Sequence, residues 1–352
     1  MIKRIIKKEF MGFMAVQGQK RKRVSIVDVA HRAGVSQATA SRVFDPKWEG
    51  KIRLETRAAV EKAAKELGYH GTSALVRGLR GTRTGIIALV MGLTTGYLYQ
   101  EVIMRFVRAL RGKGWQVLIF EAEPARNVDA MISQVCSYQV DAIIITAPAT
   151  TTTVIDSFCD TDIPVVVFNR MVTGSHCSAV YCDGRTAAAT AADFLLAHGH
   201  RRIGVITGNA NVSKEEGRIE GFCQRIESQG GEIAAVIQGD YFYDSGYTCA
   251  ESLLRSHHLD AIFCAEDSIA MGAMDAARAC FGLRIPEDLS IMGFDNISIG
   301  AFRSYELTTM CYPLDKMIAS TIEIVEAMIA DPSRRIERIY DMDLVQRKSV
   351  RL

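Results

Sequence analysis

The sequence predicts a small all-α head joined to a larger α/β body of two parallel-sheet lobes. At 352 residues the chain is too long for one ordinary hydrophobic core. Residues 24–69 show the apolar spacing of helices, whereas apolar runs alternate with amphipathic stretches from Gly85 onward. The 48% hydrophobic and 23% charged residues are typical of a soluble globular protein, and no apolar run reaches the ~20 residues of a membrane span.

Residues 1–23 form a basic segment that we expect to be a disordered arm. The segment ends in four consecutive basic residues, Lys20 to Arg23. A secretory signal peptide would end instead in a small-residue cleavage site before an exported domain. The alternative is that these residues precede a true translation start at Met11 or Met14.

Residues 24–70 are predicted to form a helix-turn-helix domain. Ser25 caps the first helix, and Gly34 ends it in the left-handed conformation. Val35 fills the corner, and Ser36 caps the second helix. The apolar face of the first helix consists of Ile26, Val29, Ala30 and Ala33. A third helix follows, with Val60, Ala63, Ala64 and Leu67 inward and Gly68 as its stop.

The second helix of the head carries side chains suited to reading DNA. Ala40 and Val43 are expected to be buried, which leaves the opposite face exposed. That face carries Gln37, Ala38, Ser41 and Arg42. Glutamine pairs with adenine, arginine with guanine, and alanine contacts the thymine methyl group in the major groove. The alternative is a plain helical bundle with the same packing.

The charge of the chain favours the DNA-binding interpretation. Residues 1–83 have a net charge of +12, whereas the remainder has a net charge of −10. A basic head on an acidic body indicates that the head binds a polyanion. A solvated basic face would give the same composition, so the charge alone does not decide.

From residue 85 onward the chain is predicted to form two α/β lobes. Residues 71–84 carry glycines and arginines and are expected to be a hinge or linker. Buried strands are expected at 86–90, 117–120, 142–145, 165–168, 203–206, 234–237, 261–264 and 289–292. Because so many crossover units exceed one sheet, we expect an N-lobe of about 85–180 and 311–338 and a C-lobe of about 181–310 and 339–352. A ligand would bind between the lobes, at the carboxyl ends of the strands.

No residue pattern in the chain indicates catalysis or a metal site. The nine cysteines are scattered without a Cys-x-x-Cys pair and are expected to be reduced. His198 and His200 stand in a glycine turn, a poor spacing for chelation, and are expected to mark a helix end. The chain has no nucleophile elbow or phosphate loop, so we expect no enzyme, no cofactor and no metal.

The head resembles that of the LacI/GalR family of transcriptional regulators, which includes the lac and purine repressors. The matching residues run from Asp28-Val29-Ala30 through Ala33-Gly34-Val35-Ser36 to Thr39 and Ser41-Arg42. The resemblance implies that Gln37, Ala38 and Arg42 read bases and that Ser36, Thr39 and Ser41 contact phosphates. Family members follow the head with Tyr-x-Pro-Asn and a hinge helix whose leucine enters the minor groove; Leu79 is the matching candidate here, although Tyr69-His70-Gly71-Thr72 lacks the Pro and Asn.

The body resembles the family's effector domain, which is itself similar to periplasmic sugar-binding proteins. The matching pieces include Asp183-Gly184, Arg218 to Phe222, Glu266 to Ala273 and Gly293 to Asn296. The resemblance implies an effector site of Asn169, Arg170, Arg218, Tyr241 or Phe242, Glu266 and Asp295. Two residues depart from the family: Glu266 replaces the usual Asn, and Tyr312 a frequent Gln. Such an acid favours an internal ion pair, or an amine-bearing or hydroxyl-rich effector.

The sequence therefore predicts a cytoplasmic, nucleoid-associated regulator, a repressor by the family majority, that binds palindromic double-stranded operator DNA as a homodimer. A small carbohydrate-like effector would control it by changing the angle between the lobes. Two other classes of protein are an exported sugar-binding receptor with a vestigial head, for which the sequence shows no convincing signal peptide, and a carbohydrate enzyme, for which it shows no catalytic constellation.

Overall fold

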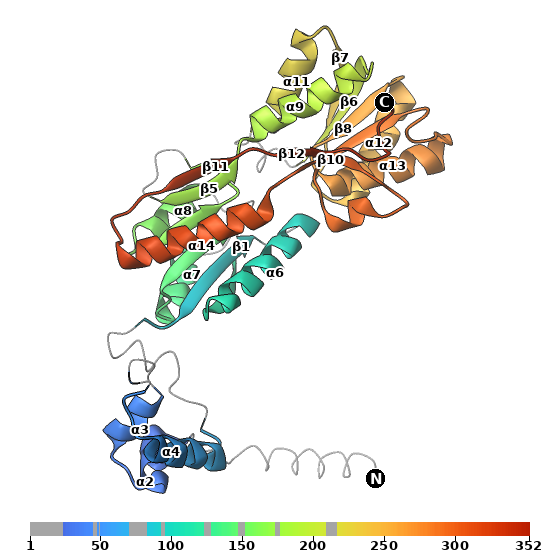
Figure 1. Cartoon of the computed structure of the whole chain (residues 1–352). Helices are drawn as coiled ribbons and strands as arrows, with labels where there is room; N and C mark the ends of the chain where they lie inside the picture. Colours follow the sequence, from blue (N-terminus) through green and yellow to red (C-terminus); the bar gives the residue numbers. More distant parts are fainter. Residues whose placement is uncertain are drawn as a thin grey trace, which may run out of the picture. The chain divides into compact units, whose positions relative to one another are not determined.

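The computed structural model falls into two compact units, Met1–Thr82 and Arg83–Leu352 (Figure 1). The predicted fold class, an all-α head with an α/β body of two lobes, is confirmed. The residues that the structure describes are 24–44, 48, 50–69, 83–92, 96–122, 128–146, 152–172, 177–208 and 217–352.

Three helices make up the described part of the head: α2 (Ile26–Ala33), α3 (Gln37–Val43) and α4 (Leu54–Leu67). Ser25 and Asp28 form a reciprocal capping box at the start of α2, in which each side chain accepts from the other residue's backbone N–H. Gly34 ends the helix at φ 68°, a left-handed conformation that costs glycine little. The Ser36 hydroxyl accepts from the Thr39 N–H at 3.1 Å and caps α3. The predicted caps of α2 and α3 are therefore confirmed.

One small apolar cluster holds the head together. It joins the inward faces of the three helices through Ile26, Val29, Ala30, Ala40, Val43, Val60, Ala63 and Ala64. Three of these eight residues come from α2 and two from α3. Four of the eight are alanines, whose small side chains let the helices approach closely. Burial of Ala40 and Val43 fixes the rotation of α3 about its axis and so decides which of its side chains face solvent.

The first lobe contains a parallel sheet in the order β11-β5-β4-β3-β1-β2. Its strands are β1 (Ile86–Gly92), β2 (Gln116–Ala122), β3 (Ala142–Thr146), β4 (Val165–Phe168), β5 (Ser178–Cys182) and β11 (Glu337–Tyr340). Its helices are α6 (Tyr97–Gly112), α7 (Val128–Ser137), α8 (Thr152–Cys159) and α14 (Leu314–Ala330). Helices α6 and α14 contact each other, as do α7 and α8. The central strands are apolar along their length because helices cover both faces of such sheets.

The second lobe repeats the arrangement in the order β12-β10-β9-β8-β6-β7. Its strands are β6 (Arg202–Thr207), β7 (Glu232–Gln238), β8 (Ala261–Cys264), β9 (Ser290–Asp295), β10 (Thr308–Cys311) and β12 (Asp343–Val345). Its helices are α9 (Gly184–Ala197), α11 (Arg218–Ser228), α12 (Tyr243–Ser256), α13 (Asp267–Phe281) and the 3₁₀ turn η3 (Ser298–Ala301). Only the edge strand β12 pairs antiparallel within the described part of this sheet.

The chain passes between the lobes at three places within the described body: from β5 to α9, from β10 to α14, and from β11 to β12 (Figure 1). These crossings bring Asp183 and Tyr312 to the region between the sheets. Three short crossings of this kind are a natural hinge, since a few residues at element ends can absorb a change in the angle between two rigid lobes.

One cysteine pair corrects the sequence-based expectation. Cys159, at the end of α8, forms a disulfide with Cys177, which precedes β5, and their Cα atoms are 5.9 Å apart. The expectation that all nine cysteines are reduced is therefore wrong for these two, because the return of the chain from β4 to β5 brings together residues 18 positions apart. The remaining cysteines are free; burial raises the pKa of the Cys264 thiol well above its ordinary value.

Removing this disulfide is expected to destabilise the oxidised body. A Cys159→Ser, Cys177→Ser double variant should lose about 3 kcal/mol of unfolding free energy, because the bond no longer restricts a short loop of the unfolded chain. Urea unfolding without reductant measures the loss, and the same titration with dithiothreitol is the control. Equal stability of wild type and variant under non-reducing conditions would contradict the assigned bond.

Candidate functional site

The outer face of α3 presents the three side chains that were predicted to read bases. Gln37, Ala38 and Arg42 are all exposed, since Ala40 and Val43 hold the opposite face in the core of the head. The three side chains offer an amide, a methyl group and a guanidinium, which match adenine, thymine and guanine edges respectively. The geometry of α3 can therefore serve major-groove recognition.

The residues predicted to contact phosphates lie at the start of α3 and along its flank. The hydroxyls of Ser36 and Thr39 are 2.8 Å apart, and Ser36 is exposed. Ser41 is half-buried one turn further on. All three hydroxyls can donate to an anionic oxygen, although Ser36 already accepts from the backbone of Thr39.

Trp48 is a feature of this surface that the sequence reasoning did not use. The guanidinium carbon of Arg42 lies 4.4 Å from the centre of a Trp48 ring, and the Lys51 ammonium lies 5.9 Å from it. A cation over an indole face is attracted by the ring and is restrained in its orientation. The signal in the sequence was an aromatic residue six positions after Arg42 and three before Lys51.

Some predicted elements lie outside the described residues. They are the basic arm 1–23, the hinge residue Leu79, and the residues Asp45 to Lys47 of the loop after α3. The hinge contributes only Arg83 and Thr84 to the described chain.

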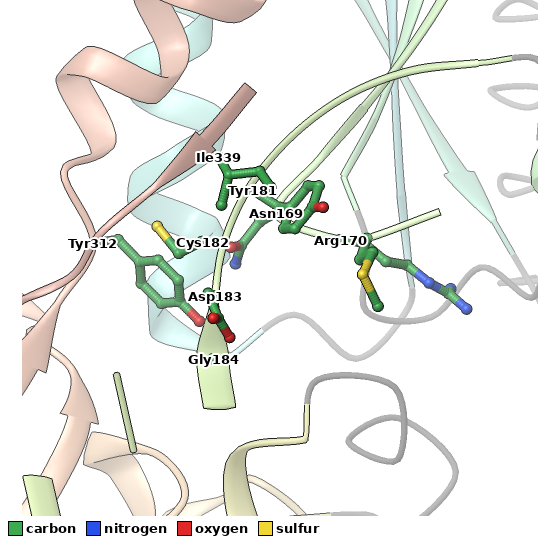
Figure 2. Close-up of a pocket in the computed structure, with 9 residues that line it drawn as sticks. Asn169, Arg170, Tyr181, Cys182, Asp183, Gly184, Tyr312 and Ile339 are labelled. Carbon is green, nitrogen blue, oxygen red and sulfur yellow. The ribbon is translucent and has the colours of Figure 1, made fainter. Parts of the chain in front are cut away.

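A cavity of about 250 Å³ lies where the chain crosses between the lobes (Figure 2). Its lining residues are Asn169, Arg170, Met171, Tyr181, Cys182, Asp183, Gly184, Tyr312 and Ile339. The cavity brings together the predicted residues Asn169 and Arg170, but the Arg170 guanidinium points away from the other labelled side chains (Figure 2). Asn169 is held at φ 58° with its amide 3.4 Å from the Tyr99 hydroxyl.

Asp183 and Tyr312 line the same cavity and were not in the predicted effector set. Asp183 caps α9, and hydrogen bonds from Thr186 keep the pKa of its carboxyl below the ordinary value. The Tyr312 hydroxyl accepts from Arg218 at 2.8 Å. Asp183 could have been found, because it directly follows an apolar strand in the same way as Asn169.

Arg218 is buried at the start of α11 and is held by several partners. Its guanidinium donates to the Ala265 carbonyl and to the Tyr312 hydroxyl, and its carbon lies 3.8 Å from the centre of the Phe294 ring. These contacts come from α11, the end of β8, β9 and the crossing after β10. Arg218 therefore couples the second lobe to a segment that moves if the lobes rotate.

Glu266 and Asp267 are neighbouring acids buried at the start of α13. Burial, together with the charge of the neighbouring Asp267, raises the pKa of Glu266 to about 8. Burial likewise raises the pKa of Asp267 to about 7, against hydrogen bonds from Thr309 and the Ile297 N–H that lower it. The pair shares its titration, so protonation of one affects the other.

Tyr241, Phe242 and Asp295 complete the predicted set. Tyr241 and Phe242 line a second cavity of about 450 Å³ together with Gly96, Tyr97, Gln100, Tyr243, Asp244 and Ser268. Asp295 is buried at φ 119°, a strained conformation for an aspartate, but lines neither of these two cavities. The structure thus divides the predicted set between two described cavities and the packed region between them.

The described part of the chain also bears on metal binding and on membrane insertion. Over those residues, no three His, Cys, Asp or Glu side chains gather as metal ligands. None of the described helices combines the length and apolar character that a membrane crossing requires. His198 is the C-cap of α9, with Nδ1 2.7 Å from the Phe194 carbonyl, and His200 is fully buried.

Comparisons with known proteins give a consistent result. Residues 25–71 match the family model "Bacterial regulatory proteins, lacI family", and residues 192–350 match "Periplasmic binding protein-like domain". The HTH-type transcriptional repressor PurR of Klebsiella pneumoniae (strain 342) is 30% identical over 339 residues, covering 93% of this chain and 96% of the relative.

Two solved structures are similar to the chain over nearly its full length. The lac repressor dimer bound to operator and the anti-inducer ONPF gives a TM-score of 0.82 at 21% identity, covering 94% of this chain and all of that one. A complex of the transcriptional regulator CelR with cellobiose gives a TM-score of 0.67 at 25% identity, covering 93% and 100%.

Proposed function

The chain belongs to the lacI family of bacterial regulatory proteins, and we propose that it reads its operator with α3 and senses its effector between the lobes of its body. It is a ligand-regulated, DNA-binding transcriptional repressor. The domain limits proposed are a head of 24–70, a hinge of 71–84 and an effector-binding and dimerisation body of 85–352.

The observation that carries the DNA-reading proposal is the rotation of α3. Ala40 and Val43 in the core place Gln37, Ala38 and Arg42 outward together. We assign these three to base edges and Ser36, Thr39 and Ser41 to phosphates. Leu79 is proposed as the minor-groove wedge on the family resemblance alone.

A homodimer on a palindromic site is the proposed assembly. Two copies of α3, related by a two-fold axis, would enter successive major grooves of a palindrome. The lac repressor, whose fold this chain shares, is a dimer bound to operator in its solved structure.

The effector proposed is a sugar or sugar-like metabolite. Asn169 and Asp183 line a cavity at the crossings, where amide and carboxylate groups can pair with hydroxyls. CelR, at 25% identity, is solved with cellobiose. Effector binding would change the angle between the lobes, and that change would reach the hinge and the heads.

We propose a cytoplasmic, nucleoid-associated protein with no enzymatic activity, as its relatives are named as regulators. Fractionation that recovers the protein from the periplasm would favour an exported sugar-binding receptor instead.

Two measurements on the full-length protein test the proposed function. Random-sequence duplexes selected by the protein should converge on a palindrome, and footprinting should show protection of both half-sites. A thermal-shift screen of sugars, sugar acids and nucleosides should find a compound that raises the melting temperature, because a ligand stabilises the state it binds. The compound must then alter operator affinity; a binder that leaves it unchanged would remove the effector-control part of the proposal.

Replacing Trp48 tests whether its ring positions Arg42. Trp48→Ala should weaken operator binding by about 0.5–1 kcal/mol per half-site, because Arg42 loses its cation–π restraint. Trp48→Phe keeps an aromatic face and should lose less. Fluorescence anisotropy with the selected operator measures both variants, and a scrambled duplex is the control. An equal loss on the scrambled duplex would show that Trp48 contacts the DNA backbone instead.

A further inference from the structure

One oxygen of the buried Glu266 carboxyl has no hydrogen-bond partner among the described residues. The side chain is 4% exposed, and its Oε1 atom accepts from the Ser268 hydroxyl at 3.1 Å. Its Oε2 atom is buried and receives no hydrogen bond from any described residue. A buried acceptor without a donor costs free energy, and an unpaired charge costs more. A ligand that donates a hydrogen bond to Oε2 would therefore stabilise the site.

Glu266 lies at the contact between the lobes, where an effector would act. It follows β8 of the second lobe, yet a Cβ on Gly96, at the start of α6 in the first lobe, would lie 3.1 Å from its Oε1 atom. Gly96 and Ser268 both line the 450 Å³ cavity that Tyr241 and Phe242 share. A ligand in that cavity thus borders two residues close to the Glu266 carboxyl.

The charged groups around Glu266 do not fully neutralise its carboxylate, so a further cation would be attracted to it. Asp267, on the same helix, adds a second buried acid and acts on Glu266 as a like charge, as does the Cys264 thiol of β8 when ionised. Arg218 of α11 is the cation that acts on Glu266, but it donates to Ala265 and Tyr312. Arg347 acts on Asp267 instead and donates to Asn296 and Leu307.

We propose that the effector carries a protonated nitrogen that donates to Oε2 of Glu266. This inference rests on the proposed control of the protein by an effector. An amino sugar has this chemistry together with hydroxyls that the Gln100 amide and the Asp244 carboxylate of the 450 Å³ cavity can bind. A neutral polyol can share a hydrogen bond with this carboxyl, but only a cation stabilises its ionised form. The family's usual amide at this position would accept a hydrogen bond without preferring a cation.

Proton release distinguishes a cation from a neutral ligand. Because burial raises the pKa of Glu266 to about 8, the empty site holds a proton at pH 7. When an ammonium group binds, Glu266 ionises and its proton passes to solvent, while the ligand keeps its own. Cation binding should therefore release up to one proton at pH 7, and affinity should rise with pH as long as the ligand's own ammonium stays protonated. A neutral sugar should release none.

The test uses the full-length protein and matched probes. Thermal shifts are measured with D-glucosamine and D-glucose, D-galactosamine and D-galactose, agmatine and cadaverine as other cations, and sugar acids and nucleosides as the remaining classes. The strongest binder is then titrated calorimetrically at pH 7 in two buffers of different ionisation enthalpy, which counts the protons released.

Two variants with the same change of charge complete the test. Glu266→Gln should lose cation affinity at least tenfold, about 1.4 kcal/mol, and should lose the proton release. Glu287→Gln, at an exposed acid that lines neither of the two cavities, should change neither. Glu266→Gln should fold at least as well as wild type at pH 8, since it removes a buried carboxylate.

Each outcome decides the inference. Cation-selective binding that Glu266→Gln abolishes supports it. Selective binding of neutral or anionic compounds, with unchanged affinity in Glu266→Gln, overturns the inference but leaves the proposed effector control intact. If no class of compound shifts the melting temperature, the inference and the effector control fail together, while operator selection still tests the DNA-reading part.

Discussion

Arg42→Ala is expected to abolish specific operator binding while leaving effector affinity intact. Arg42 is exposed on the outer face of α3, where a guanidinium can donate both hydrogen bonds to guanine O6 and N7. Loss of one such pair costs about 1–3 kcal/mol per half-site, so a dimer loses about 2–6 kcal/mol, or roughly 30-fold to 10⁴-fold in affinity. Anisotropy titrations against the selected operator and a scrambled duplex measure the loss of discrimination.

Arg42→Lys is the matched control for charge. It keeps the positive charge that attracts phosphates but lacks the planar fork that pairs with guanine. It should therefore bind scrambled DNA as wild type does and still lose the operator preference. The fold of the head should survive both changes, because Arg42 contributes nothing to the apolar cluster. Unchanged footprints on the operator with Arg42→Ala would remove the base-reading role.

The head was predictable in detail because its structure follows from local rules. The cap at Ser25, the left-handed Gly34 and the buried Ala40 each depend on residues within a few positions of one another. Trp48 escaped prediction for the opposite reason. Its position over Arg42 depends on the path of a loop, and the sequence shows only that an aromatic residue is nearby.

The body was predictable in its class but not in its edges. Strands β5, β10, β11 and β12 were not expected. In β11, Glu337 and the exposed Ile339 carry none of the apolar signal of a buried strand. Its place in the sheet comes from pairing with β5, more than 150 residues earlier. Because β5 was missed, Asp183, which follows it directly, was not recognised as a cavity residue.

The site residues were predicted as a set, whereas the structure distributes them. Arg218 and Tyr312 meet through a hydrogen bond between residues 94 positions apart, a contact that no local pattern encodes. Tyr312 had been noted only as a departure from the family. The replacement of the family's Asn by Glu266 was visible in the sequence, but its burial and its unpartnered oxygen depend on how the lobes close.

At pH 5, Asp267→Ala is expected to destabilise the body by about 2–6 kcal/mol, roughly 1–3 kcal/mol for each of the two donors that it leaves unsatisfied. Asp267 is fully buried; its Oδ1 accepts from the Thr309 hydroxyl at 2.6 Å and its Oδ2 from the Ile297 N–H at 2.8 Å. It thereby ties the start of α13 to β10 and to the segment after β9. Alanine leaves both donors unsatisfied and opens a cavity beside Gly293, whose own Cβ would clash with Oδ1.

Asp267→Asn separates the hydrogen bonds from the charge, and pH is the variable that shows it. The pKa of Asp267 is raised to about 7 on folding, so its stabilising contribution is complete below pH 4 and is lost as the pH rises through 7. Glu266 acts in the same direction up to about pH 8. Wild type should therefore lose unfolding free energy between pH 5 and 8, by at most about 1.4 kcal/mol per pH unit for each acid.

Asparagine cannot titrate, but its oxygen can accept from Ile297 and its amide can donate to Thr309. Its deficit relative to wild type should be largest at pH 5 and should shrink by pH 8. The alanine deficit should shrink by the same amount, since alanine does not titrate either, and should exceed the asparagine deficit at every pH. Urea unfolding at pH 5, 6.5 and 8 measures both; an asparagine deficit that grows with pH would show that ionised Asp267 stabilises the fold, contrary to its raised pKa.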